Sequence, residues 1–273
     1  MTQLSVDQTS DGWDAASARY DEHLPELLRP YALACIRLAE VAPGHELLDV
    51  AAGSGVLTLA VAPRVARVVA IDFSPQMIEL LAGHAARAGL ANVAAHVMDG
   101  QALALPDASF DRVTSNFGLI FFPDRIKGFA EMHRVLRPGG RAVVSTWSVL
   151  ERFEPLAMFM SALQQVVPDL PRPPQPPPLL SLADPGKLAA EMRAGGFEDV
   201  RVESSTGYFE APSAEELWAR FASGAPPVAA ILSRIGPENA ARVRDLGIGA
   251  LRQRFGEGPV KLAAEAHYGV GVR

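Results

Sequence analysis

Residues 45–72 of the chain read HELLDVAAGSGVLTLAVAPRVARVVAID and contain three segments of different character. The apolar run ELLDVA (46–51) predicts a buried strand, GVLTLAVAPRVA (55–66) predicts a helix, and RVVAID (67–72) predicts a second buried strand. A right-handed crossover through the helix places the two strands side by side and parallel in one sheet. This stretch therefore predicts an α/β fold.

The same alternation of short apolar strands and amphipathic helices continues beyond this unit. Residues 74–89 predict a helix with a clear start, because Ser74 can cap it. Residues 125–137 predict another helix, ended by Pro138-Gly139-Gly140. Since the strand segments are apolar on both faces, they indicate a doubly wound, mostly parallel sheet that is covered by helices on both sides. Further strands are expected at residues 92–99, 110–118 and 141–148.

The two flanks of the chain show a looser pattern. Residues 13–40 predict helices with breaks at Pro25 and Pro30. The segment PDLPRPPQPPP (168–178) cannot form a helix or a central strand, so it indicates an extended surface connection, with a proline-recognising partner as the alternative. Helices are also expected at 149–165, 185–197 and 213–254, and strands at 199–210 and 260–272.

The composition bounds the class of protein. The chain has 273 residues, of which 49% are hydrophobic and 21% charged, as in a packed globular protein. Lys and Arg number 25 against 31 Asp and Glu, and the pI is near 5.6. Because proteins that bind phosphate backbones need a basic surface, we expect no nucleic-acid partner.

Cys35 is the single cysteine of the sequence. One thiol cannot form an internal disulfide or a multi-cysteine metal site, and its apolar neighbours predict a buried side chain. No His, Asp or Glu cluster has metal-ligand spacing, so no metal is predicted. The N-terminal segment does not resemble a signal peptide, and no apolar stretch reaches the roughly 20 residues of a membrane span, so we expect a cytoplasmic protein.

Glycines and acids follow three successive predicted strands. Gly53 and Gly55 follow the first strand, Asp72 ends the second and Asp99 ends the third. In a doubly wound sheet these strand ends meet at the crevice where nucleotide-type cofactors bind. Asp72 has the spacing of an acid that binds two ribose hydroxyls, although a cap of the following helix would also explain it. The nicotinamide fingerprint G-x-G-x-x-G is incomplete, because Thr58 replaces its third glycine.

Four longer segments occur in order within residues 45–148: LLDVAAGSGVLTL, VVAIDFSPQMIELL, MDGQALALPDASFDRVTSNFGLIFFPD and EMHRVLRPGGRAVVSTW. They resemble the successive motifs of class I S-adenosylmethionine-dependent methyltransferases. The similarity is greatest to the branch that includes the ubiquinone/menaquinone C-methyltransferases and many natural-product methyltransferases. This resemblance implies a Rossmann-like seven-stranded sheet with helical lid insertions, and S-adenosyl-L-methionine as cofactor. Ala51 departs from the motif, where the family often has glycine.

The resemblance also implies roles for individual residues. The Gly53–Ser54–Gly55 turn would hold the amino-acid end of the cofactor, with Asp49 beneath it. Asp72 would hold the ribose, Asp99 would bind the adenine amino group, and Asn116 would lie near the sulfonium. The complete predicted cofactor site comprises Tyr20, Asp49, Ala51, Gly53, Ser54, Gly55, Asp72, Phe73, Met77, Asp99, Gly100, Gln101, Asn116 and Phe117.

The motifs identify fewer residues of the substrate pocket than of the cofactor site. His23, Phe121 and Trp147 are predicted to line the substrate pocket. His23 lies on the N-terminal segment that folds over the cofactor in this family, and its intrinsic pKa suits a base, but a surface histidine is the alternative and no catalytic residue is assigned. Phe73 and Met77 would flank the adenine unless they serve ordinary helix–sheet packing.

We expect one methyltransferase domain over residues 1–273, with a helical cap at 1–44, a cofactor-binding core at 45–148 and substrate lids at 149–182 and 211–258. The predicted reaction is in-line methyl transfer to O, N or C of a small, partly apolar biosynthetic metabolite. The alternatives are a catalytically silent regulator or scaffold, a methyltransferase that acts on macromolecules, and a nicotinamide oxidoreductase. The acceptor and the oligomeric state stay open.

Overall fold

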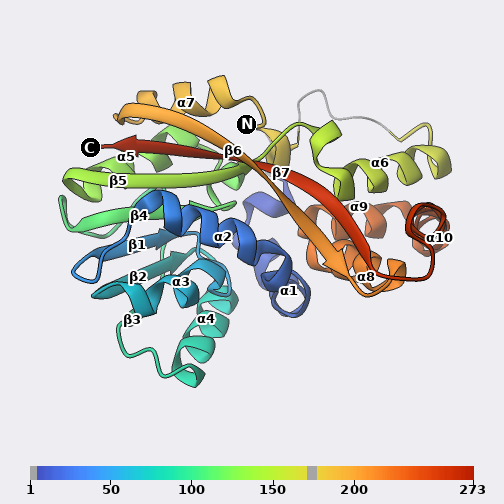
Figure 1. The fold of residues 1–273 in the computed structure, drawn as a ribbon, viewed down its shortest axis with the longest axis horizontal. Helices are drawn as coiled ribbons and strands as arrows, with labels where there is room; N and C mark the ends of the chain where they lie inside the picture. The colour runs from blue at the N-terminus through green and yellow to red at the C-terminus, as the bar shows by residue number, and fades with distance from the viewer. Residues whose placement is uncertain (1–4, 171–176) are drawn as a thin grey trace.

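A seven-stranded sheet in the order β3-β2-β1-β4-β5-β7-β6 runs through the computed structural model, which describes residues 5–170 and 177–273 (Figure 1). β7 is antiparallel to its neighbours β5 and β6, and the other neighbouring strands are parallel. The predicted doubly wound, mostly parallel fold is thereby confirmed. The strands are β1 (Glu46–Val50), β2 (Arg67–Asp72), β3 (Val93–Val97), β4 (Phe110–Asn116), β5 (Leu136–Trp147), β6 (Glu198–Ala211) and β7 (Val260–Val272).

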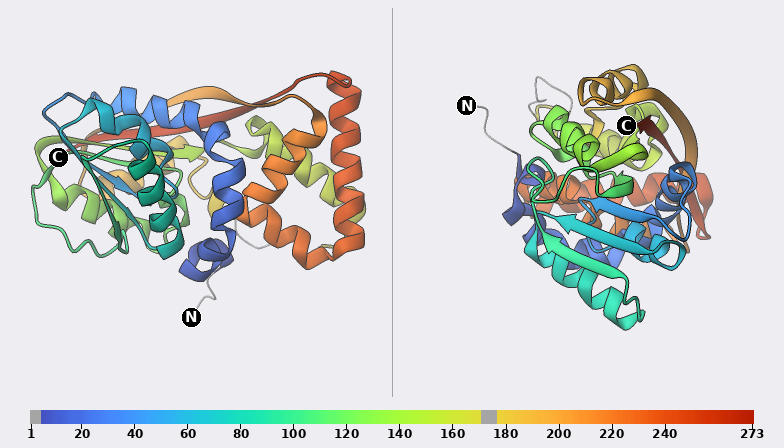
Figure 2. Two further views of the ribbon diagram at one scale, coloured as in Figure 1. Left: turned by 90° about the horizontal axis from the view of Figure 1, so that it is seen from below. Right: turned by 90° about the vertical axis from the view of Figure 1, so that its left-hand side faces the viewer.

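Ten α-helices occur in the described part of the chain. They are α1 (Ser10–His23), α2 (Pro25–Ala39), α3 (Val56–Val61), α4 (Pro75–Arg87), α5 (Arg125–Val135), α6 (Glu154–Val166), α7 (Pro185–Ala194), α8 (Ala214–Gly224), α9 (Pro226–Ile235) and α10 (Pro237–Phe255). Helices α2, α3 and α4 cover one face of the sheet, and α5 and α7 cover the other (Figure 1). Helices α6, α8, α9 and α10 gather at one end, where the long strands β6 and β7 extend beyond the core (Figure 2).

The sheet reverses its winding between β1 and β4. Leu48 of β1 pairs with Val69 of β2 on one side and with Val113 of β4 on the other. These three side chains are almost fully buried, as the continuous apolar pattern of the strands requires. A crevice therefore opens beyond the carboxyl ends of β1 and β4, which is the usual ligand site of this architecture.

Three expected boundaries are wrong. Pro30 does not break the N-terminal helices but lies inside α2, where it is exposed and the buried stripe continues past it. Helix α3 ends at Val61, earlier than expected, since Pro63 follows in a short 3-10 turn. Helix α5 ends at Val135, before the predicted Pro-Gly-Gly stop, because the chain already pairs with β4 from Leu136 onward.

The remaining elements lie near their expected positions, although β5 begins at Leu136 instead of residue 141 and α7 ends at Ala194 instead of residue 197. Pro25 separates α1 from α2, and Ser74 caps α4 by accepting a hydrogen bond from the backbone of Met77. Residues 171–176 of the predicted proline-rich connection lie outside the described residues. No helix in the described ranges is long and apolar enough to cross a membrane.

The lid helices α8 and α10 pack closely at Gly247, where there is no room for a side chain. A Cβ placed on Gly247 of α10 would collide with the ring of Trp218 on α8, whereas a Cβ on Gly249 of the same helix would meet nothing within 4 Å. We expect Gly247→Ala to destabilise the protein by about 1–3 kcal/mol, because the Trp218 ring must move.

Gly249→Ala is the matched control, and we expect it to stabilise the helix by up to about 1 kcal/mol through helix propensity alone. Urea unfolding of both variants checks the prediction. Equal effects of the two substitutions would show that Trp218 is not held against α10.

Candidate active site

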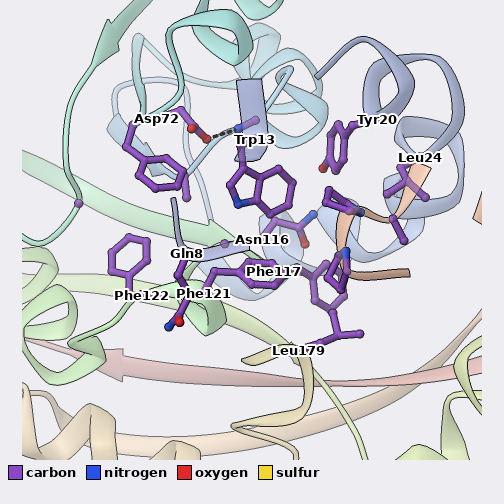
Figure 3. A pocket seen from close by; sticks show the side chains of 18 of the residues that line it. Gln8, Trp13, Tyr20, Leu24, Asp72, Asn116, Phe117, Phe121, Phe122 and Leu179 are labelled. Atoms are coloured by element: carbon purple, nitrogen blue, oxygen red, sulfur yellow. Dashed lines mark hydrogen bonds between the residues drawn. The ribbon is translucent and has the colours of Figure 1, made fainter. Parts of the chain in front are cut away.

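A cavity of about 350 Å³ opens at the carboxyl ends of the parallel strands, between α1 and the lid helices (Figure 3). At its polar end lie residues that follow β1, β2 and β3. The opposite side is an aromatic chamber, a name used here for the rings of Phe117, Trp147, Phe153, Phe209 and Phe221. The polar end comprises Ala51, Gly53, Asp72, Phe73, Asp99, Gly100 and Gln101.

Asp72 organises the polar end. Its Oδ2 accepts a hydrogen bond of 2.9 Å from the backbone N–H of Gly53, and its Oδ1 accepts one of 2.9 Å from the N–H of Ser74. Burial raises the pKa of Asp72 to about 6, even though these N–H donors favour the ionised form. Each oxygen keeps a further lone pair that a hydroxyl donor can use.

The turn after β1 has an unusual backbone. Ala51, Gly53 and Gly55 all have positive φ angles, of 55°, 56° and 102°. Alanine tolerates this region poorly, so Ala51 holds a strained conformation at the edge of the cavity. The ring of Tyr20 from α1 lies 3.6 Å from the position that a Cβ on Gly53 would take. The Gly53 backbone is therefore covered by the cap helix.

Asp49 lies beneath this turn but does not line the cavity. Its carboxylate accepts hydrogen bonds from the hydroxyls of Thr58 (2.7 Å) and Thr114 (3.2 Å), which join β1, α3 and β4. Burial raises the pKa of Asp49 to about 7 despite these donors. Thr58, which replaces the third glycine of the nicotinamide fingerprint, thus has a structural partner of its own.

The loop after β3 is fixed by a chain of hydrogen bonds. Asp99 Oδ1 accepts from the backbone N–H and from the side-chain amide of Gln101, at 2.8 and 3.1 Å. Gln101 Oε1 in turn accepts from the N–H of Asp124 at the start of α5. A Cβ on Gly100 would come within 2.5 Å of the Phe122 ring, so glycine allows this ring to close the polar end.

Helix α1 is anchored to the turn after β2. The Ser10 hydroxyl donates to the carbonyl of Phe73 at 3.0 Å. Asp14 accepts from the Ser74 hydroxyl and from the N–H of Gln76. The face of α1 that carries Trp13 and Tyr20 points into the cavity (Figure 3).

The aromatic chamber is built around a stack of three rings. Phe117 lies on Trp147 with centroids 3.9 Å apart, and Trp147 lies on Phe153 at 4.3 Å. Phe209 and Phe221 meet Phe153 edge to face. Trp147, Phe209 and Phe221 lie on β5, β6 and α8, whereas Phe117 directly follows β4 and Phe153 directly precedes α6, so the stack connects the core of the sheet with the lid.

The cavity brings together most of the predicted residues. Tyr20, Ala51, Gly53, Asp72, Phe73, Asp99, Gly100, Gln101, Asn116, Phe117, Phe121 and Trp147 line it. Asp49, Ser54, Gly55, Met77 and His23 lie outside its lining. Met77 is buried within α4, and the Cβ of His23 packs close to Gly224 of α8.

Other lining residues were not predicted. Gln8, Thr9, Ser10 and Trp13 enter from the N-terminal segment, Leu24 and Leu28 from α2 and its start, and Phe153, Phe209, Phe221 and Pro226 from the lid side. Trp13, Tyr20 and Leu24 are seven and four residues apart, which places them on one face of a helix. This apolar face is the signal in the sequence that could have revealed part of the set.

The buried Asp49 makes a pH-dependent stability effect testable through Asp49→Asn. The pKa of Asp49 is about 7 in the folded chain against an ordinary 3.8, so the folded chain keeps a proton that the unfolded chain releases between these values. Rising pH therefore removes stability in this range, by up to about 1.4 kcal/mol per pH unit. We expect urea unfolding to show wild type losing stability relative to Asp49→Asn from about pH 4 to about pH 7.

Asp245→Asn, at an exposed carboxylate of α10 that pairs with Arg244, is the control and should follow the wild type at every pH. A gap between wild type and Asp49→Asn that stays constant with pH would contradict the effect of burial on Asp49.

Comparison with known proteins relates this geometry to a family. A family profile described as a methyltransferase domain matches residues 47–140. Nocamycin O-methyltransferase from Saccharothrix syringae is 32% identical over 217 residues, which covers 75% of this chain and 78% of that protein. Demethylmenaquinone methyltransferase from Deinococcus radiodurans is 37% identical over 166 residues, which covers 56% of this chain and 68% of that protein.

Among solved structures, the YcgJ protein from Bacillus subtilis superimposes with a TM-score of 0.58 at 21% identity, and the match covers 89% of this chain and 97% of that one. This likeness supports the fold alone. The profile match covers the turns after β1, β2 and β3, which form the polar end of the cavity. The chain therefore belongs to the S-adenosylmethionine-dependent methyltransferases, and S-adenosyl-L-methionine is its methyl donor.

Proposed function

We propose that this methyltransferase acts on O, N or C of a small, partly apolar metabolite. The observation that carries the proposal is the continuity of the cavity, in which the polar end and the aromatic chamber share one space. Cavities lined by apolar and aromatic side chains with a few polar groups are typical of small-molecule sites. A relative named as an O-methyltransferase supports the same reading.

The residues of the polar end fit the cofactor. Asp72 presents a buried carboxylate for two ribose hydroxyls, and Asp99 presents an exposed one for the adenine amino group. The hydroxyl of Ser54 is buried without a hydrogen-bond partner, the one such side-chain atom among the described residues. Because Ser54 does not line the cavity, this hydroxyl is not among the groups that support the cofactor site.

The protein's own contribution to the reaction is positional. When bound, S-adenosylmethionine would supply a methyl group activated by a positively charged sulfur; the acceptor's lone pair would bond to the methyl carbon, and the electron pair of the C–S bond would stay on sulfur. The strand-end turns and the aromatic chamber hold the two reactants in line, an effect that contributes about 7–11 kcal/mol in well-oriented systems. The cap residues Trp13 and Tyr20 exclude water from the junction.

Different segments of the chain serve the cofactor and the acceptor in this proposal. We propose a single domain in which residues 1–44 form the cap, 45–148 the cofactor core, and 149–182 with 211–258 the acceptor lid. The lining residues support this division, because the core provides the polar end and the lid provides Phe153 and Phe221.

Asp72 offers the direct test of the cofactor site. We expect calorimetric titration to show S-adenosylhomocysteine binding to the wild type, and Asp72→Asn to weaken it by about 10–100-fold, since hydrogen bonds to a charged group are worth about 1.5–3 kcal/mol. NADH titrated in parallel should not bind.

Asp245→Ala is the control for removing an exposed acid and should bind like the wild type. A thermal melt of each variant separates lost binding from lost folding. Binding of NADH in place of S-adenosylhomocysteine, or unchanged affinity in a folded Asp72→Asn, would refute the proposed site.

A further inference from the structure

Asn116 is the last residue of β4 and lies where the two halves of the cavity meet. Its side chain lies among Trp13, Tyr20 and the Phe117 ring in the close view of the cavity (Figure 3). An amide has a carbonyl that accepts and an N–H₂ group that donates. Which of the two faces the cavity decides what Asn116 can bind.

The carbonyl oxygen of Asn116 is already occupied. The backbone N–H of Phe117 donates to Ser145 Oγ at 3.0 Å, which leaves the Ser145 hydroxyl proton free to donate to Asn116 Oδ1 at 2.9 Å. The Cys35 thiol donates to the same oxygen, with 3.7 Å between sulfur and oxygen. Burial raises the pKa of Cys35 to about 12, so this thiol keeps its proton and stays a donor.

The N–H₂ group of Asn116 consequently points away from Ser145 and Cys35. The hydrogen bonds of Asn116 all use its Oδ1, which leaves Nδ2 without a partner. Within residues 5–170 and 177–273, Ser54 Oγ is the one side-chain nitrogen or oxygen that is both buried and without a partner, so Asn116 Nδ2 is not fully buried. Because Asn116 lines the cavity, the space beside Nδ2 is the cavity. The chain thus holds an amide donor in a fixed orientation at the junction.

We propose that Asn116 Nδ2 donates a hydrogen bond to an oxygen of the methyl acceptor, and that this oxygen is a hydroxyl on a planar apolar ring, a phenol or an enol. The inference rests on the proposed function. The lining of the cavity beside Asn116 is mostly aromatic and apolar, which suits a flat apolar body. A donor aimed at a hydroxyl oxygen strengthens as that oxygen becomes negative, so Asn116 favours the ionised form of the acceptor.

Asn116 acts here as a positioning residue, and Ser145 acts through it. The Ser145 hydroxyl fixes which end of the amide meets the acceptor, so removal of this hydroxyl lets the amide turn. Substitution of either residue should therefore cause the same functional loss. Substitution of Asn116 removes the amide donor, and substitution of Ser145 leaves that donor without a fixed orientation.

A coloured phenol makes the inference measurable without knowledge of the natural acceptor. The probe is 7-hydroxy-4-methylcoumarin, a flat phenol whose neutral and ionised forms absorb at different wavelengths. It is titrated from acid to alkaline pH on protein saturated with S-adenosylhomocysteine. We expect the wild type to lower the pKa of the bound phenol by about one unit relative to Asn116→Leu, the effect of one hydrogen bond to an ionised oxygen.

Ser145→Ala should lose most of the same shift, and it keeps the test decisive if Asn116→Leu does not fold. Asn239→Leu, which removes an amide on α10 that does not line the cavity, is the matched control and should keep the wild-type shift. Each variant is also titrated with S-adenosylhomocysteine by calorimetry, and Asn239→Leu should keep the wild-type affinity.

The outcomes separate this inference from the proposed function. Failure of the wild type to bind S-adenosylhomocysteine would overturn the proposed function itself. Normal cofactor-product binding with no coumarin binding, or with the same phenol pKa in wild type and Asn116→Leu, would overturn the inference alone. Weaker S-adenosylhomocysteine binding in Asn116→Leu and in Ser145→Ala would also overturn it, by assigning the amide to the cofactor.

Discussion

The two hydrogen bonds from Gly53 and Ser74 to the Asp72 carboxylate hold the polar end of the cavity in place. They join the turn after β1 to the turn after β2, so neither turn can move without breaking a bond to a buried carboxylate. Ser74 also donates from its hydroxyl to Asp14, which brings the cap helix onto the same turn. The turn after β1, the turn after β2 and helix α1 therefore depend on one side chain whose burial raises its pKa to about 6.

A second constraint lies across the cavity, where backbone strain coincides with the aromatic stack. Phe117 has a φ of 60°, as unfavourable for phenylalanine as the φ of 55° is for Ala51 on the facing strand end. Such conformations cost about 1–3 kcal/mol and persist only where their surroundings fix them. The Ser145 hydroxyl holds the Phe117 N–H, and the Trp147 ring holds its side chain. The strain is thus concentrated in two residues that line the cavity, Ala51 and Phe117.

The strands and helices of the core could be predicted from the sequence because local patterns mark where they begin and end. The buried strands of 45–148 have apolar runs, and Ser74 marks a helix start, so periodicity and capping placed the polar end and Asp72 correctly. The lid side depended on contacts over long separations, such as Phe153 with Phe209, which no local pattern encodes. Pro30 was misjudged because tertiary burial on both sides of it outweighs its local effect.

Helix α1 connects the two constraints. Its Ser10 and Asp14 bind the turn that carries Phe73 and Ser74, whereas the chain at its far end packs against α8, where a Cβ on Gly224 would approach Leu24 within 2.8 Å. One helix therefore touches both the turn after β2, at the polar end of the cavity, and helix α8 on its aromatic side. Trp13 and Tyr20 of α1 both line the cavity between these two attachments. The shape of the cavity wall therefore depends on how α1 packs between the turn after β2 and helix α8.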